Sequence, residues 1–168
     1  MLKSTVITMA AISLLALSGS VDATTTGTTT STVTTGSTPD CSGAAASAGV
    51  IWPPDHKMVS ETIVGVTDPF SLSLVIVVTS IMQDESVAAI GSGNTSPDGA
   101  GIGTSTAQIR AERAGPGTGR IYFISFSATN TQGAQCTGTV NVFVPHDQGQ
   151  GFTPIDTGER FDSTQTYF

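Results

Sequence analysis

The chain has 168 residues, a formal net charge of −7 and only 11% charged residues. Its acidic balance argues against a nucleic-acid partner, because binding to phosphates needs clustered lysine and arginine. Of the 6 lysines and arginines, Lys3 lies near the N-terminus and the others are Lys57, Arg110, Arg113, Arg120 and Arg160.

Residues 1–23 are predicted to be an export signal that is cleaved after Ala23. Lys3 precedes an apolar run over 6–17, and small residues follow in 18–23. The run is shorter than the roughly 20 residues that span a bilayer, so a retained anchor is the less favoured alternative. No later segment is as long and apolar, so we expect no membrane span after the signal is removed. The protein is then expected to be secreted or at the cell surface, with the periplasm as the alternative.

Residues 24–40 consist almost entirely of Thr, Ser and Gly. Such a segment has too little apolar surface to offset the entropy of ordering it, and we interpret it as a flexible linker. Residues 41–147 have the composition of one domain. Residues 148–168 are predicted to be a polar C-terminal tail, because Gly149, Gly151 and Pro154 disfavour regular structure.

Within the domain, apolar and polar residues alternate with a period of two, which is typical of half-buried strands. The clearest case is the segment 119–129, followed by a turn at 130–133 and a second strand, which together predict a hairpin. About seven short strands favour an immunoglobulin-like antiparallel β-sandwich, an all-β fold. The predicted strands are 49–52, 61–66, 72–81, 87–90, 104–112, 119–129 and 137–144.

Cys41 and Cys136 are the two cysteines of the chain. An even number of cysteines in an exported protein favours a disulfide between them. A bridge that closes so long a loop stabilises the fold by about 4 kcal/mol in the chain-entropy description. Two separate thiols are the alternative.

Four segments resemble a motif set of secreted bacterial domains that are immunoglobulin-like or cadherin-like. They are 51–57 (IWPPDHK), 83–85 (QDE), 110–122 (RAERAGPGTGRIY) and 144–149 (VPHDQG). The resemblance covers most of 41–149 and implies a β-sandwich without enzymatic activity. This chain departs from the pattern in two loops, with GSGN at 91–94 instead of GDGD and DPFS at 68–71 instead of DPDG. Both departures remove acidic side chains, which argues against ion binding by these two loops.

Sandwich connectivity predicts where the acidic segments lie. If the first strand pairs parallel with the last, Cys41 and Cys136 meet at one pole and four acidic segments meet at the other. Cadherin-like domains bind calcium in a similar arrangement, and calcium takes six to eight oxygen ligands. The resemblance therefore implies calcium as a cofactor, with the candidate ligands Asp55, Asp84, Glu85, Glu112 and Asp147.

A salt-bridge cluster is the favoured alternative to calcium, because structural ion pairs are common. In that alternative the same acids are neutralised by Lys57, Arg110, Arg113 and Arg120. His56 and His146 are expected near this pole too. They favour hydrogen bonds to loop carbonyls over a zinc site, since structural zinc sites are richer in Cys and His.

No pattern in the sequence predicts catalysis. The chain has no Gly-x-Ser-x-Gly elbow and neither cysteine has a base nearby. Asp84 and Glu85 are adjacent, so on a strand they point to opposite faces and do not cooperate. We therefore expect a non-catalytic secreted or cell-surface module that binds or adheres to a protein or glycan partner. The alternatives are a self-associating structural subunit of an extracellular matrix or filament, and an accessory protein of a secreted hydrolase system.

Overall fold

The computed structural model of the protein describes residues 37–93, 95–149 and 154–166. The predicted signal, residues 1–23, and residues 24–36 of the predicted linker lie outside these ranges. Within them every regular element is a β-strand. We also find no helix in these ranges with the length and apolar character needed to cross a membrane.

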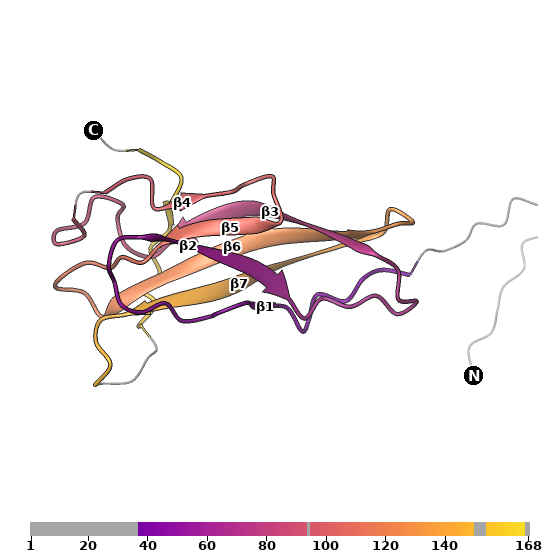
Figure 1. Ribbon diagram of the computed structural model, residues 1–168, viewed down its shortest axis with the longest axis horizontal. Helices are drawn as coiled ribbons and strands as arrows, with labels where there is room; N and C mark the ends of the chain where they lie inside the picture. The colour runs from indigo at the N-terminus through magenta and orange to yellow at the C-terminus, as the bar shows by residue number, and fades with distance from the viewer. Residues whose placement is uncertain (1–36, 94, 150–153, 167–168) are drawn as a thin grey trace, which may run out of the picture. The chain divides into compact units, whose positions relative to one another are not determined.

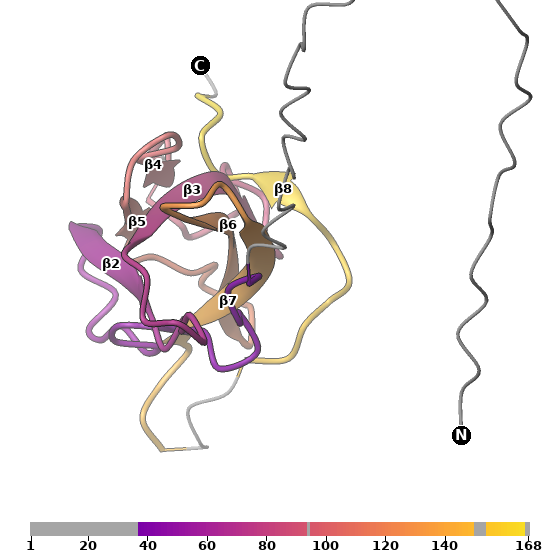
Figure 2. The same cartoon turned by 90° about the vertical axis from the view of Figure 1, so that its right-hand side faces the viewer.

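The strands form two four-stranded sheets, in which every pair of neighbours is antiparallel. One sheet has the order β1-β2-β5-β4 and contains β1 (Ala45–Ala46), β2 (Met58–Val64), β5 (Thr106–Arg110) and β4 (Gly99–Ala100). The other has the order β7-β6-β3-β8 and contains β7 (Gln135–Pro145), β6 (Gly119–Asn130), β3 (Leu74–Gln83) and β8 (Phe161–Asp162). The sheets face each other across the core, as the end-on view in Figure 2 shows. The prediction of an all-β antiparallel sandwich is confirmed.

The hairpin of β6 and β7 is the longest paired unit of the domain (Figure 1). Alternate residues of β6 face the core, where Ile124 and Phe126 are buried. Gly138 of β7 lies over the Phe126 ring, and a Cβ at this position would come within 2.9 Å of two ring atoms. The absence of a side chain at this core position therefore makes room for the large aromatic ring opposite.

Two links join the start of the domain to β7. The predicted disulfide between Cys41 and Cys136 is confirmed, with a Cα–Cα distance of 6.0 Å. Val50 pairs with Phe143 in a parallel bridge, and the Ile51 amide donates to the Phe143 carbonyl at 2.8 Å. The expected parallel pairing of the first and last strands is thus present, although 49–52 forms an isolated bridge instead of a strand.

Three segments differ from the predicted elements. Residues 87–90 form a turn instead of a strand, because their backbone bonds stay local, as in the 3.0 Å bond from the Ala89 amide to the Ser86 carbonyl. The segment 95–103, in which no strand is predicted, contains β4 and the buried Asp98. In the expected tail, 148–168, β8 pairs with the end of β3. Each of these strands has two residues, too few to produce a periodic sequence pattern.

Candidate functional site

Arg120, the second residue of β6, brings a positive charge into the interior of the sandwich. Its position in the strand alternation places its side chain on the core-facing side, together with that of Tyr122. The side chain is 0% exposed. A guanidinium removed from water in this way is tolerated only when acids and hydrogen-bond acceptors surround it.

Three carboxylates from three loops surround the Arg120 guanidinium. Its Nη1 atom donates to Asp98 Oδ2 at 2.7 Å, and its Nε atom donates to Glu85 Oε2 at 3.1 Å. The Nη2 atom lies 3.8 Å from Glu112 Oε1. Glu85 follows β3, Asp98 precedes β4 and Glu112 follows β5, so the cluster ties both sheets together. We call Arg120 with Glu85, Asp98 and Glu112 the Arg120 cluster.

Neighbouring groups fix the orientation of the cluster. Gln83 donates from its Nε2 atom to Asp98 Oδ2 at 3.0 Å, and Arg110 Nε lies 3.4 Å from Asp98 Oδ1. The Tyr122 hydroxyl accepts from Arg120 Nη1 and donates to the Arg110 carbonyl, at 3.1 and 2.9 Å. Burial raises the pKa of Asp98, although the positive charge of Arg120 acts in the opposite direction. Burial also raises the pKa of Tyr122, which therefore keeps its proton and can donate.

Glu112 extends the cluster toward the surface. Its Oε2 atom accepts the hydroxyl proton of Thr95 and lies 3.0 Å from His56 Nδ1. The His56 side chain is 46% exposed, and its ring packs over Gly93, where a Cβ would come within 2.9 Å. Because the Thr95 hydroxyl donates to Glu112, it is not oriented toward His56 as an activated nucleophile would be.

Asp84 lies beside the cluster but has its own partners. Its Oδ1 atom accepts from the Ile121 amide at 2.8 Å, and its carbonyl accepts from the Thr157 hydroxyl at 3.0 Å. Its buried Oδ2 atom has no hydrogen-bond partner among the described residues. Burial raises the pKa of Asp84, and the charge of Glu85 adds to the increase.

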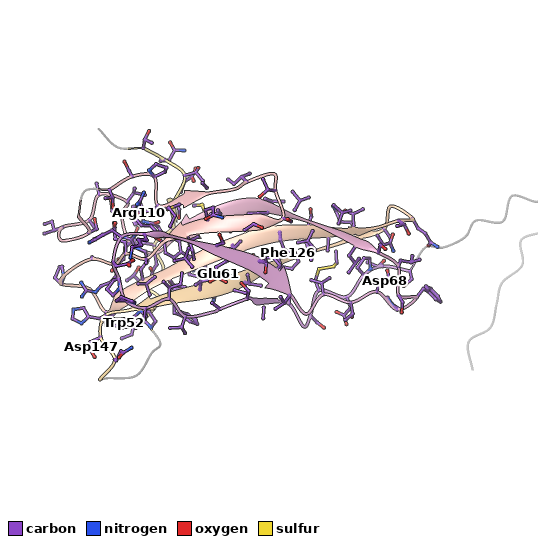
Figure 3. The ribbon with its side chains drawn as sticks, viewed as in Figure 1. Trp52, Glu61, Asp68, Arg110, Phe126 and Asp147 are labelled. Carbon is purple, nitrogen blue, oxygen red and sulfur yellow. A yellow bond between two sulfur atoms is a disulfide. The ribbon has the colours of Figure 1, made fainter. Side chains whose placement is uncertain are left out.

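The two other predicted ligands belong to separate surface pairs. Asp55 Oδ2 accepts from Lys57 Nζ at 2.5 Å. Asp147 Oδ2 lies 3.2 Å from His146 Nδ1, and its Oδ1 accepts from the Gly149 amide at 2.7 Å. Figure 3 shows Asp147 at the same end of the sandwich as Arg110, and Asp68 at the opposite end. The acidic segments are thus at one pole, as the connectivity predicted, but the five acids divide among several pairings.

The Arg120 guanidinium stands between Glu85, Asp98 and Glu112, where a cation shared by these carboxylates would have to bind. In the described ranges no group of three or more His, Cys, Asp or Glu side chains is arranged to hold a metal ion. The positive charge of the guanidinium is therefore matched by these three carboxylates. The salt-bridge alternative is present in part, because Arg120 pairs with Glu85 and Glu112, and Lys57 pairs with Asp55. Arg110 instead pairs with Asp98, and Arg113 donates to the backbone carbonyls of Ala114 and His146. Calcium binding stays a prediction.

No protein-family model matches the chain, and neither a curated protein nor a solved structure does. The candidate site therefore rests on its own geometry.

Asp98 is the residue of the site that the sequence analysis did not select. It accepts from Arg120 and Gln83 and pairs with Arg110, so its carboxylate has three side-chain partners. A signal for it exists in the sequence. Arg120 occupies a core-facing position of a period-two strand and therefore requires a buried acid near it. That requirement does not say which acid of the chain supplies the charge.

Proposed function

We propose that the protein is a non-catalytic, secreted or cell-surface β-sandwich module that binds or adheres to an extracellular partner. The observation that carries this proposal is the state of the charged groups at the acidic pole. Glu85, Asp98 and Glu112 lie against Arg120 below the surface, and this mutual pairing supports a structural role for these acids. The disulfide supports the compartment, because such bonds persist where the environment is oxidising.

The proposal is tested by a binding assay combined with a turnover assay. The purified protein is offered immobilised extracellular proteins, neutral glycans and acidic glycans, and each bound material is then analysed for cleavage. We expect saturable binding to at least one class and no cleavage. Cleavage of a bound substrate, or binding to none of the classes, contradicts the proposal.

The second candidate function is a structural subunit of a matrix or filament. It is favoured by an edge of β3 whose backbone groups are partly unpaired among the described residues. Val78 exchanges backbone hydrogen bonds with Gly103 and Thr104 on the edge that faces away from β6. Alternate residues of a strand direct their backbone N–H and C=O groups to the same edge. The backbone groups of Leu74 and Ile76 therefore point to the same edge of β3 as those of Val78. No described residue forms a backbone bond with them at that edge. Such an edge is a template for strand pairing with another chain.

Light scattering after size exclusion distinguishes the two candidates. A binding module is expected to elute as a monomer over a wide concentration range. Large ordered assemblies that grow with concentration support the structural subunit and contradict the lone module.

Calcium stabilisation belongs to the proposal as a separate, independently testable part. A ligand that binds only the native state raises the unfolding temperature, and the rise grows with the logarithm of its concentration once that concentration exceeds the dissociation constant. If calcium binds, thermal melts in millimolar calcium and in a chelator differ, with the higher melting temperature in calcium. Superimposable melts contradict calcium binding and leave Arg120 as the cation of the pole.

A further inference from the structure

One outer sheet face of the domain carries a regular array of hydroxyl and amide side chains. Along β6 the residues that face away from the core include Ser125, Ser127 and Thr129, each partly exposed, and their register partners on β7 are exposed. Paired residues of neighbouring strands project from the same side of a sheet. We call these six residues the hydroxyl face: Ser125, Ser127, Thr129, Gln135, Thr137 and Thr139.

The hydroxyl face has a definite extent. From Ser125 to Thr129 it runs along the strand for about 13 Å at the usual rise per residue. Val75 and Val77 of β3 pair with Thr129 and Ser127 and continue the same surface with apolar side chains. The Val75 side chain is 65% exposed. Donors, acceptors and an apolar border therefore lie side by side on β3, β6 and β7, which are neighbouring strands of one sheet (Figure 1).

No residue of the hydroxyl face or of its apolar border is charged, although the chain contains 13 acidic residues. The described charges lie mainly in the loops at the acidic pole and in the C-terminal segment. A nucleic acid or an anionic membrane needs clustered cations, which this face does not have. The neutral face is complementary to a partner that is itself uncharged.

The hydroxyl groups also argue against dry packing on a second copy of the sheet. Within the face, Ser125 Oγ lies 3.0 Å from Thr139 Oγ1, and Gln135 Nε2 donates to Thr129 Oγ1 at 3.1 Å. These bonds leave further donor and acceptor capacity on every hydroxyl. Burying that capacity against an apolar surface has an energetic cost, whereas a partner rich in hydroxyls satisfies it.

We infer that the hydroxyl face binds an uncharged polysaccharide, which lies along β6 and β7 with its hydroxyls bonded to Ser and Thr and its apolar ring edges against Val75 and Val77. This inference rests on the proposed binding function and names the class of partner. It is separate from the acidic pole, whose charged groups are occupied by one another.

Two variants with matched controls test the inference. Thr137→Glu places a charge in the middle of the face, and Thr139→Val removes one hydroxyl while it keeps the shape of the side chain. Thr62→Glu and Thr62→Val make the same changes at an exposed threonine on the other sheet, in β2. Melting curves establish that all variants are folded, and Thr139→Val carries the test if Thr137→Glu does not fold.

The probes are insoluble cellulose, chitin, amylose and mannan as neutral polysaccharides, with polygalacturonate as an acidic one, in sedimentation assays. We expect the protein to bind at least one neutral polysaccharide with little dependence on salt, because no charges take part. Binding should weaken about tenfold or more in Thr137→Glu, less in Thr139→Val, and not at all in the Thr62 controls.

Three results overturn the inference. Binding to a neutral polysaccharide that is unchanged in Thr137→Glu and Thr139→Val shows that another surface is used. Binding only to polygalacturonate, or only to the immobilised proteins of the binding assay described above, contradicts the partner class and leaves the binding function intact. Absence of binding to these polysaccharides contradicts the inference, and absence of binding to the immobilised proteins as well contradicts the proposed function.

Discussion

Arg120 is a single residue on which the arrangement of three loops depends. Its charge is matched by Glu85, Asp98 and Glu112, each of which arrives from a different connection. Removing one partner of a buried ionic network lowers stability far more than replacing the whole network with apolar residues. The reason is that the remaining charges stay buried and unpaired.

We predict that Arg120→Met, which keeps most of the side-chain volume, lowers the free energy of unfolding by about 3–5 kcal/mol. Urea unfolding followed by fluorescence measures the loss. Arg160→Met is the control, since Arg160 also pairs with an aspartate but its side chain is 39% exposed. The control should lose much less, because water solvates the Asp156 carboxylate that remains. Equal losses in both variants contradict the central role of Arg120.

Asp156 gives a prediction for the effect of pH. Hydrogen bonds from Arg160, with a further bond from the Gly158 amide, lower the pKa of Asp156 to about 2. A carboxyl with a lowered folded-state pKa stabilises the fold above its unfolded pKa, and this contribution is lost as the pH falls through the folded value. The contribution of Asp156 should therefore disappear between about pH 4 and pH 2.

The measurement compares urea unfolding of the protein and of Asp156→Asn at intervals over this range. We expect the protein to be the more stable of the two at pH 5 and the difference to shrink as the pH approaches 2. A difference that stays constant or grows on acidification contradicts the assignment.

At the scale of elements, the disulfide constrains most of the domain. The bond joins residues that are 95 positions apart in the sequence. We predict that the double variant Cys41→Ser, Cys136→Ser loses about 4 kcal/mol of stability through the greater entropy of its unfolded chain. Denaturant unfolding of the oxidised protein and the double variant measures the loss. Identical midpoints contradict the prediction.

The long strands could be predicted from the sequence, and the short ones could not. The alternation in 119–129 and 137–144 placed β6 and β7 within one or two residues of their observed ends, because each strand buries one face over many residues. The strand β8, in contrast, exists because Phe161 and Asp162 pair with the end of β3. Backbone pairing of two residues uses no particular side chains and leaves no pattern in the sequence.

The candidate site was predictable to the extent that strand connectivity determines which loops meet. That reasoning placed Glu85 and Glu112 at one pole, and both contact Arg120. It did not resolve the pairing of individual side chains. Asp55 bonds to Lys57, two residues away, and Asp147 lies against the adjacent His146, so local partners compete with the shared centre.

At the scale of the whole domain, charged and uncharged surfaces are separated. The ionic groups concentrate where the loops meet, and the outward faces of β6 and β7 carry hydroxyl, amide and apolar residues and no charged one. Only 11% of the residues are charged. Because several of them form the buried ionic cluster, few remain for the solvent-exposed surface. This separation is why we place the structural role at the pole and the binding role on the sheet face.

The position of the disulfide also determines how the domain carries mechanical load. Tension applied from the N-terminal side reaches Cys41 and crosses the sulfur–sulfur bond directly into β7 at Cys136. The stretch of chain between the two cysteines, which includes β2, β3, β5 and β6, lies outside this covalent path. When the domain is pulled between its N-terminal and C-terminal sides, the force therefore passes through a short covalent path. The strands between the two cysteines cannot be extended by this force as long as the disulfide is intact.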